Sequence, residues 1–402
     1  MELNNYKLGE CLELQRGYDL TSSQMQVGEV AVVGSNGIIG YHNAERGNSP
    51  CITVGRSGSV GKVHYYEQPT WTHNTALFVK DFKGNNPKYL YYLLKNLHLD
   101  KIFERGSSVI PSLDRKLVHS LVVPFHKNIN DQRKIVAVLS ALDRKIELNK
   151  QINDNLEAMA KQLYDYWFVQ FDFPNEEGKP YKSSGGAMVW NEKLKREIPE
   201  GWSVSNVKSL IEPIERGLSY SSDDLLDPFA TPMINLACFS KDGDYRLGEM
   251  KFFSGKVSND KLISPMDMLI ACTDMTQGAD IIGRPILASG EYDQYTFSTD
   301  LALITPKGKF KMYLYYTLRT PFYHKYIRPF ASGTTVKHLN LIGVENYGLP
   351  VPPIEIQSKF EDLITPIKEK QSKNLNEINA LTKQRDELLP LLMNGQASVN
   401  SD

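Results

Sequence analysis

The chain has 402 residues, enough for two or more domains, and its 46 lysines and arginines nearly balance its 47 aspartates and glutamates. A protein that bound nucleic acid alone over a large surface would usually be more basic, so this balance favours partners that share the phosphate contacts. No apolar run approaches the roughly 18–20 residues that cross a bilayer, and MELNNYKLGE shows no signal-peptide pattern, which excludes a membrane-spanning protein and predicts a cytoplasmic location.

The first part of the chain is predicted to be rich in short strands. EVAVVG (29–34), CITVG (51–55) and TALFVKD (75–81) combine β-branched and apolar residues between glycine-containing turns. The amphipathic segment PKYLYYLLKNL (87–97) predicts a short helix, and LVVP (121–124) predicts a strand that ends at proline. Together these elements predict one mixed α and β domain.

A long helix is predicted next, from about Asp131 to Gln170. Its apolar residues recur in steps of three and four, as in a coiled coil, and no proline or glycine interrupts them. Residues 171–202 are then rich in glycine, proline, serine and charge, which is typical of a linker. Trp190 and Trp202 indicate that parts of this linker dock.

The second part of the chain follows the same order. DMLIACT (267–273) and LALITP (301–306) predict strands, and KMYLYYTLRTP (311–321) predicts a short helix. A second long helix is predicted over about 356–393, and Pro366 inside it and Pro390 near its end should kink or restart it.

The two long helices most simply pair with each other in opposite directions as an antiparallel coiled coil. Pairing with another protein is the alternative, and both arrangements can hold at once. The polar residues that interrupt the apolar stripes, and are expected to fix their register, are Asn149, Gln371 and Arg385.

Six short matches indicate that the chain is one unit written twice. Their order is the same in both halves, and their period is far too long for a solenoid, so we expect two domains of similar fold. The matches are LGECLELQRG (8–17) with KSLIEPIERG (208–217), THNTAL (72–77) with STDLAL (298–303), YLYYLLK (89–95) with YLYYTLR (313–319), GSSV (106–109) with GTTV (333–336), LVVP (121–124) with LPVP (349–352), and QRKI (132–135) with QSKF (357–360).

No motif for catalysis is found in the sequence. GRSGSVGK (55–62) departs from the phosphate-binding GxxxxGK[ST] pattern at Arg56 and Val63, so it is a hairpin turn or a loop whose N–H groups meet a nucleic-acid backbone. The nearest string to an adenine-methyltransferase motif, DPF (227–229), lacks its second proline. The four cysteines stand far apart, so we expect neither a metal, a disulfide nor a cofactor in this chain.

At this point the chain resembles the specificity subunits of Type I restriction-modification enzymes, and the resemblance covers nearly all of it. The strings that carry it are GYHN (40–43), THNTALFVKDFKG (72–84), the helical stretch 131–173, GKPYKSSGGAMV (178–189), EIPEGW (197–202) and QRDELLPLLMNGQ (384–396). The first copy lacks the GW element that opens the second and starts near the equivalent of Lys208, so the C-terminal end is expected to close the first domain.

The resemblance implies an α+β fold, in which two similar mixed α/β target-recognition domains are joined by two long helices. It also implies the domain boundaries. These are target-recognition domain 1 (1–125), a central helical region (126–171), a linker (172–200), target-recognition domain 2 (201–353), a C-terminal helical region (354–394) and a tail (395–402).

The resemblance further implies a non-catalytic subunit that reads a bipartite site in double-stranded DNA. Two methyltransferase subunits would bind the helical regions, supply S-adenosylmethionine and flip the adenine for N6 methylation. Restriction subunits would add ATP- and Mg-dependent translocation and cleavage. The alternatives are a Type IIB-like specificity subunit, a coiled-coil adaptor that binds no DNA, and a self-contained DNA enzyme, which the missing motifs disfavour.

The repeat sorts the candidate DNA-binding residues. Residues that both copies share suit phosphate or scaffold contacts, whereas residues that differ at matched positions suit base contacts. The shared set is Arg16 with Arg216, and Ser107 and Ser108 with Thr334 and Thr335. The differing set is His73 and Asn74, which align with Thr299 and Asp300, and Arg56 and Ser57, which align with the region of Thr273 and Asp274. Further loop candidates are Tyr18, Tyr41, His42, Arg105, Arg284, Lys337 and His338.

Overall fold

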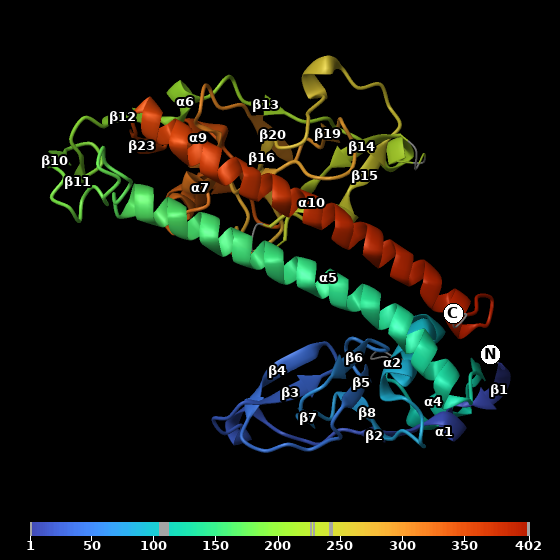
Figure 1. Ribbon diagram of the computed structural model, residues 1–402. Coiled ribbons are helices and arrows are strands. Elements are labelled where there is room, and N and C mark those ends of the chain that lie inside the picture. Colours follow the sequence, from blue (N-terminus) through green and yellow to red (C-terminus); the bar gives the residue numbers. More distant parts are fainter. Residues whose placement is uncertain (1, 104–111, 226, 228–229, 241–243, 400–402) are drawn as a thin grey trace. The chain divides into compact units, whose positions relative to one another are not determined.

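The chain divides into two compact units (Figure 1). Unit 1 combines Met1–Lys145 with Leu381–Asp402, and unit 2 is Ile146–Ala380. The computed structural model describes residues 2–103, 112–225, 227, 230–240 and 244–399. Both boundaries between the units fall inside long helices, so each unit contains a part of both helices.

Within its described residues, unit 1 holds three small sheets. One has the strand order β2-β8-β5-β6, a second has the order β4-β3-β7 with β3 and β7 parallel, and the third pairs β1 with β9. The strands are β1 (Asn4–Lys7), β2 (Glu13–Arg16), β3 (Val30–Gly34), β4 (Gly37–His42), β5 (Cys51–Gly55), β6 (Val63–Tyr66), β7 (Thr70–Thr72), β8 (Ala76–Asp81) and β9 (Val122–Phe125). The helices are α1 (Leu8–Cys11), α2 (Pro87–Asn96), α3 (Leu99–Phe103), α4 (Arg115–Ser120) and the start of α5 (Ile129–Tyr164).

The local sequence explains these elements. Every residue of β5 is buried, and Ile52 and Val54 of this central strand belong to the core of unit 1. The side chain of Asn86 caps α2 by accepting the N–H groups of Lys88 and Tyr89, and Pro87 occupies the first turn, where its missing N–H costs nothing. The apolar face of α2 is buried in the core of unit 1.

Unit 2 repeats the three sheets of unit 1, and its described residues form two more, β17-β22-β21 and the pair of β10 (Met188–Asn191) and β11 (Arg196–Pro199). Its sheets β13-β20-β16-β18, β15-β14-β19 and β12-β23 match the three sheets of unit 1 strand for strand, including the parallel pair β14 and β19. The strands are β12 (Ser203–Asn206), β13 (Glu215–Arg216), β14 (Thr231–Ile234), β15 (Lys251–Phe253), β16 (Met268–Ala271), β17 (Thr273–Asp274), β18 (Pro285–Leu287), β19 (Thr296–Phe297), β20 (Leu301–Ile304), β21 (Ala331–Ser332), β22 (Lys337–Leu339) and β23 (Gly348–Val351). The helices are α6 (Val207–Leu210), α7 (Lys311–Thr317), α8 (Pro321–Ile327), α9 (Leu341–Glu345) and the start of α10 (Ile354–Met393).

The expected duplication is therefore confirmed, but the match between THNTAL and STDLAL is wrong by one residue. The N–H of Gly17 donates to the carbonyl of Ala76, and the N–H of Gly217 donates to that of Leu301. Ala76 thus corresponds to Leu301. By the same register, His73 corresponds to Ser298, and Asn74 corresponds to Thr299 instead of Asp300. Apolar letters agree in both registers because β8 and β20 are largely buried, so only the backbone bonds distinguish them.

A similar correction applies to the hairpin after β5. The N–H of Leu113 donates to the carbonyl of Arg56, and the N–H of Leu339 donates to that of Cys272. Arg56 of the first copy therefore corresponds to Cys272 of the second, and Ser57 corresponds to Thr273. The glycine-rich stretch 55–62 connects β5 to β6, which pair in antiparallel fashion, so the hairpin interpretation is confirmed.

Both long helices are present. Helix α5 ends in a π-helical turn, η2 (Asp165–Val169), and α10 runs unbroken through Pro366 and Pro390, which the sequence predicted would kink or restart it. Pro366 is exposed, as is Asp362, whose carbonyl would receive the N–H that proline lacks. Water can satisfy that carbonyl, so the helix continues.

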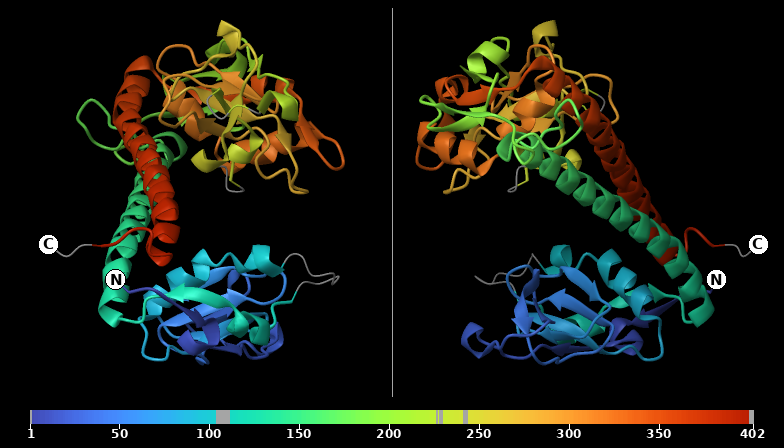
Figure 2. Two further views of the ribbon diagram at one scale, coloured as in Figure 1. Left: turned by 90° about the vertical axis from the view of Figure 1, so that its right-hand side faces the viewer. Right: turned by 60° about the vertical axis from the view of Figure 1, so that its left-hand side comes forward.

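The helices run side by side in opposite directions (Figures 1 and 2). In unit 2 the amide of Asn149 donates to Glu377 at 3.0 Å, and Asn153 Nδ2 donates to the carbonyl of Gln371 at 3.1 Å. In unit 1 the guanidinium of Arg385 donates to Asp143 at 3.0 Å. The polar residues expected to fix the register therefore bond across the pair.

Residues 172–200, expected to be a linker, fold onto unit 2. They form a hairpin of β10 (Met188–Asn191) and β11 (Arg196–Pro199), and Phe173 and Ile198 enter the unit 2 core. Trp202 is buried there, as expected, but the Trp190 side chain is exposed, and its indole N–H donates to nearby Glu192. Composition predicts a linker poorly here because buried aromatic residues hold the segment in place.

The start of the first copy also differs from expectation. Strand β1 pairs with β9 as β12 pairs with β23, so the chain begins before the equivalent of Ser203, not near that of Lys208. The C-terminal residues nevertheless complete unit 1, since Leu389, Leu392 and Met393 are buried in its core.

Candidate nucleic-acid interface

In each unit a glycine lies where the chain crosses, after the first strand of the four-stranded sheet, to the three-stranded sheet. In unit 1 the N–H of Gly17 bonds to Ala76 of β8, and the next N–H, of Tyr18, bonds to Thr72 of β7 at 2.8 Å. A Cβ on Gly17 would lie 2.2 Å from the carbonyl oxygen of His73. Only glycine allows so close an approach, and Gly217 makes the same crossing in unit 2.

Six predicted residues gather around this crossing in unit 1, and we call them the unit 1 crossing cluster. Arg16 lies 3.7 Å from Asp19, which also accepts the side-chain amide of Asn74. The N–H groups of Arg56 and Ser57 both donate to the carbonyl of Thr75, directly after Asn74. The six residues are Arg16, Tyr18, Arg56, Ser57, His73 and Asn74.

Two residues that the sequence did not single out, Arg46 and Trp71, extend this cluster. The guanidinium of Arg46 lies 4.0 Å from the centre of the Tyr18 ring and 5.5 Å from that of Trp71. His42 packs edge-on against Trp71 and accepts the N–H of Gln26. No sequence pattern reveals these contacts, since they join separate loops.

Tyr41 and His42, two predicted residues of β4, differ in exposure. His42 is only 7 % exposed and serves the packing of β4, whereas Tyr41 is 56 % exposed. Tyr41 therefore stays a candidate for contact with a ligand, and His42 acts through its neighbours. Arg105, Ser107 and Ser108 lie outside the described residues.

The crossing in unit 2 has different chemistry. Arg216 reaches Cys272, whose thiol pKa is raised to about 12 by burial. The hydroxyl of Thr273 donates to Asp300 at 2.9 Å, and the N–H of Cys272 donates to the carbonyl of that aspartate. The shared arginine thus stands beside a thiol and a carboxylate in unit 2, where unit 1 has Arg56 and Thr75.

Two predicted base readers of unit 2 are interior residues. Thr273 and Asp274 are buried, and the Asp274 carboxylate accepts the N–H groups of Thr276 and Ile281 at 2.7 and 2.8 Å. The sequence interpretation placed them on the surface because their strand, β17, is too short to show a burial pattern. They shape the following loop and do not face solvent.

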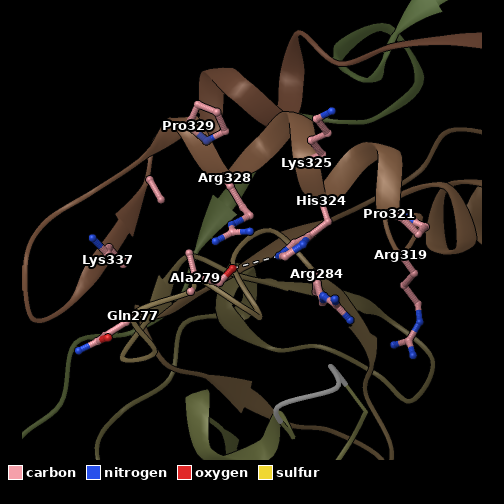
Figure 3. Close-up of a pocket in the computed structure, with 12 residues that line it drawn as sticks. Gln277, Ala279, Arg284, Arg319, Pro321, His324, Lys325, Arg328, Pro329 and Lys337 are labelled. Atoms are coloured by element: carbon pink, nitrogen blue, oxygen red, sulfur yellow. Dashed lines mark hydrogen bonds between the residues drawn. The ribbon is translucent and has the colours of Figure 1, made fainter.

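A basic hollow of about 550 Å³ lies beside this loop (Figure 3). Two predicted residues, Arg284 and Lys337, line it, together with Lys325 and Arg328, which were not among the predicted residues. The short basic run HKYIR (324–328) is the signal that could have found them. The described residues that line it include no carboxylate and are Gln277, Gly278, Ala279, Arg284, Arg319, Pro321, His324, Lys325, Arg328, Pro329, Ala331 and Lys337.

The remaining predicted residues lie near the hollow. Thr334 and Thr335 are exposed in the turn between β21 and β22, and His338 is exposed on β22. Lys337 donates to the carbonyl of Gly333 across the same turn at 2.6 Å. Hydroxyl and cationic groups of this kind suit contacts with phosphate oxygens.

The described residues include no group of three or more His, Cys, Asp or Glu placed to hold a metal ion. The four cysteines are free and buried. No helix within the described part of the chain is long and apolar enough to cross a membrane. The arrangement therefore offers hydrogen-bond donors, acceptors and positive charge for recognition.

Comparisons with known proteins agree with this description. The family model for the Type I restriction modification DNA specificity domain matches residues 2–158 and 199–383. The Type I restriction enzyme MjaIX specificity subunit of Methanocaldococcus jannaschii is 27% identical over 352 residues, which cover 85% of this chain and 76% of that protein. The HindI specificity subunit of Haemophilus influenzae is 24% identical over 371 residues, which cover 77% of each chain. The crystal structure of a Type I S subunit from M. genitalium has a similar fold, with a TM-score of 0.63, 16% identity and coverage of 98% and 96%.

Proposed function

Because this chain belongs to the family of Type I restriction-modification DNA specificity subunits, we propose that it reads a bipartite site in double-stranded DNA, one half with each unit. The observation that carries this proposal is the repeated crossing, which has the same backbone in both units and different side chains around it. Each unit would then present its own set of donors and acceptors to base edges.

The differences at matched positions support two unlike half-sites. Arg56 and Asn74 of unit 1 stand where unit 2 has Cys272 and Thr299. Arginine and asparagine side chains make paired hydrogen bonds with guanine and adenine, which cysteine and threonine do not. The shared Arg16 and Arg216 suit phosphate contacts, which orient a protein on DNA without reading sequence.

We propose that α5 and α10 form an antiparallel coiled coil that sets the spacing between the half-sites. The bonds from Asn149 to Glu377 and from Asp143 to Arg385 support one fixed register. The helices would bind two methyltransferase subunits, and restriction subunits would join them in the cytoplasm. S-adenosylmethionine, ATP and Mg would belong to these partners. Because the net charge of this chain is only −1, the partners would also supply much of the positive charge that contacts the DNA phosphates.

The proposal is tested by exchanging residues 1–125 for the equivalent region of a relative with another target. The hybrid is produced with the methyltransferase subunit of its own system, and methylated adenines are mapped across a genome. We expect one half-site to change and the other half and the spacer to stay. A change in both halves would contradict the assignment of one unit to each half.

The reciprocal exchange, of residues 203–351, is the matched control. It should alter only the half-site that the first hybrid retained. A chain that directs no sequence-specific methylation with its partner would reject DNA reading altogether.

A further inference from the structure

Unit 2 contains a loop that unit 1 lacks. Gly61 and Gly283 are matched, since their N–H groups donate to Gly55 and Ala271 at 2.9 and 2.8 Å. Between these matched points unit 1 has only residues 56–60, whereas unit 2 has residues 272–282. The added length, which we call the 275–282 loop, follows directly after β17.

This loop is held from inside at several points. The fully buried Asp274 carboxylate accepts the N–H groups of Thr276 and Ile281, and the hydroxyl of Thr276 accepts the N–H of Asp280 at 3.0 Å. From helix α8, His324 Nε2 donates to the carbonyl of Ala279 at 3.0 Å. The loop therefore has a defined shape although its tip faces solvent.

The hydrogen bond from α8 to the loop is made by a neutral histidine. Burial lowers the pKa of His324, and the nearby charges of Arg284 and Arg328 lower it further. A carbonyl oxygen only accepts, so the proton of the neutral ring stays on Nε2. His324 thus joins the loop to the wall of the hollow without adding charge.

Two side chains at the tip are exposed and of unlike chemistry. Met275 is 72 % exposed, although methionine is usually buried. Gln277 is exposed at the rim of the hollow, and the described residues give its side-chain amide no hydrogen bond (Figure 3). A held loop that presents an apolar group and an amide is built for contact with something outside the chain.

The hollow beside the tip identifies the chemistry of that partner. Lys325 and Arg328 are exposed, and Lys337 on β22 lines the same hollow. Arg319 also lines the hollow, but its charge is engaged in ion pairs with Asp244 at 2.8 Å and Glu157 at 3.8 Å. Positive charge, with no carboxylate among the described lining residues, suits the phosphates of a polynucleotide.

The geometry points to Gln277 as a base-reading residue of unit 2, with adenine as the base whose N6 and N7 fit its amide. Met275 beside it fits the methyl group of a thymine. The basic residues of the hollow hold the neighbouring phosphates, namely Arg284, Lys325, Arg328 and Lys337. This inference rests on the proposed DNA-reading function and assigns residues to one of its two half-sites.

The test uses the full chain with its methyltransferase subunits. For Gln277→Ala, genome-wide mapping of methylated adenines should show relaxed choice at one position of one half-site. Discrimination at that position, measured by anisotropy with labelled duplexes, should fall roughly 5- to 150-fold, the factor of a lost paired contact. An unchanged half-site and unchanged discrimination would overturn the assignment of Gln277.

The phosphate contacts are tested with Lys325→Ala/Arg328→Ala. This variant should bind specific and unrelated duplexes more weakly alike, and the slope of log affinity against log salt should fall by about one for each lost contact. Lys307→Ala is the matched control. Lys307 is exposed and lies just beyond the end of β20, whose other end lies at the crossing. Equal binding by the double variant and the control would overturn the role of the hollow, whereas a wild-type complex that reads no sequence would overturn the proposed function itself and this inference with it.

Discussion

Gly17 and Gly217 occupy the same place in the two units, and each passes so close to a backbone carbonyl that no side chain fits. A Cβ on Gly17 would lie 2.2 Å from the oxygen of His73, and one on Gly217 would lie 2.3 Å from that of Phe297. Neither position requires an unusual backbone angle, so it is the approach of two chain segments that demands glycine.

We predict that Gly17→Ala destabilises the protein, because backbone must move to admit the methyl group. The expected loss is about 1–3 kcal/mol of unfolding free energy, as for other overpacked sites. Urea denaturation measures it, and Gly248→Ala is the matched control, since a Cβ there meets nothing within 4 Å. Equal stability of the two variants would contradict the close approach.

Arg385→Met should be destabilising because it leaves a partly buried carboxylate with one partner fewer. Asp143 accepts the guanidinium of Arg385 at 3.0 Å and the hydroxyl of Tyr92 at 2.6 Å. The expected cost is about 1–3 kcal/mol. Adding Asp143→Asn should cost less than the sum of the two single changes, and strict additivity would show that the pair is not coupled. Lys383→Met, an exposed change on the same helix, is the control.

The stability of unit 1 should fall as the solution is acidified. His119 Nε2 accepts the N–H of Leu14 at 2.9 Å, which requires an unprotonated nitrogen, and burial together with the charges of Arg115 and Lys83 lowers the His119 pKa. The unfolded chain takes up this proton near pH 6.5 and the folded chain only at lower pH, so the unfolding free energy decreases as pH falls through 6.5.

The measurement for His119 is urea unfolding at pH 7.5, 6.5 and 5.5. His119→Gln keeps an acceptor but cannot titrate, so its stability should depend less on pH than that of the wild type. Part of the dependence will remain, since burial also lowers the pKa of His64, His126 and His324. A slope that equals the wild-type slope would refute the part assigned to His119.

If the helices set the spacer, lengthening both by seven residues should lengthen it. Insertions after Asn149 in α5 and next to its partner Glu377 in α10 keep the pairing face and add about 10 Å at 1.5 Å per residue. Methylation mapping should then show both half-sites unchanged and about three more base pairs between them, at roughly 3.4 Å each. An insertion in α5 alone is the control that breaks the pairing, and an unchanged spacer with both insertions would remove the helices as its ruler.

The sequence was most informative where a pattern is local. Alternating and helical periodicity located β3, β5, β8, α2 and both long helices, and repeated strings revealed the duplication. The register error at Asn74 arose because apolar strands match equally well after a shift of one residue. The prolines of α10 and the aromatic residues of 171–202 behave as packing and solvent dictate, which composition does not show.

The candidate site could be predicted only in part, for a related reason. Residues next to the repeated Arg-Gly pair were found because the repeat marks them. The burial of Asp274 and the stacking of Arg46 on Tyr18 depend on segments far apart in the chain. The hollow was missed because its cations come from separate strands and helices, and only two of them stood at positions that the sequence singled out.

Unit 1 contains both the first and the last residues of the chain, and this imposes an order on its synthesis. A ribosome completes every residue of unit 2 before it makes Leu389, Leu392 and Met393, which the core of unit 1 requires. The domain that is translated first is therefore the last to be finished. A premature stop codon at position 381 would spare unit 2 and leave the N-terminal unit with an open core.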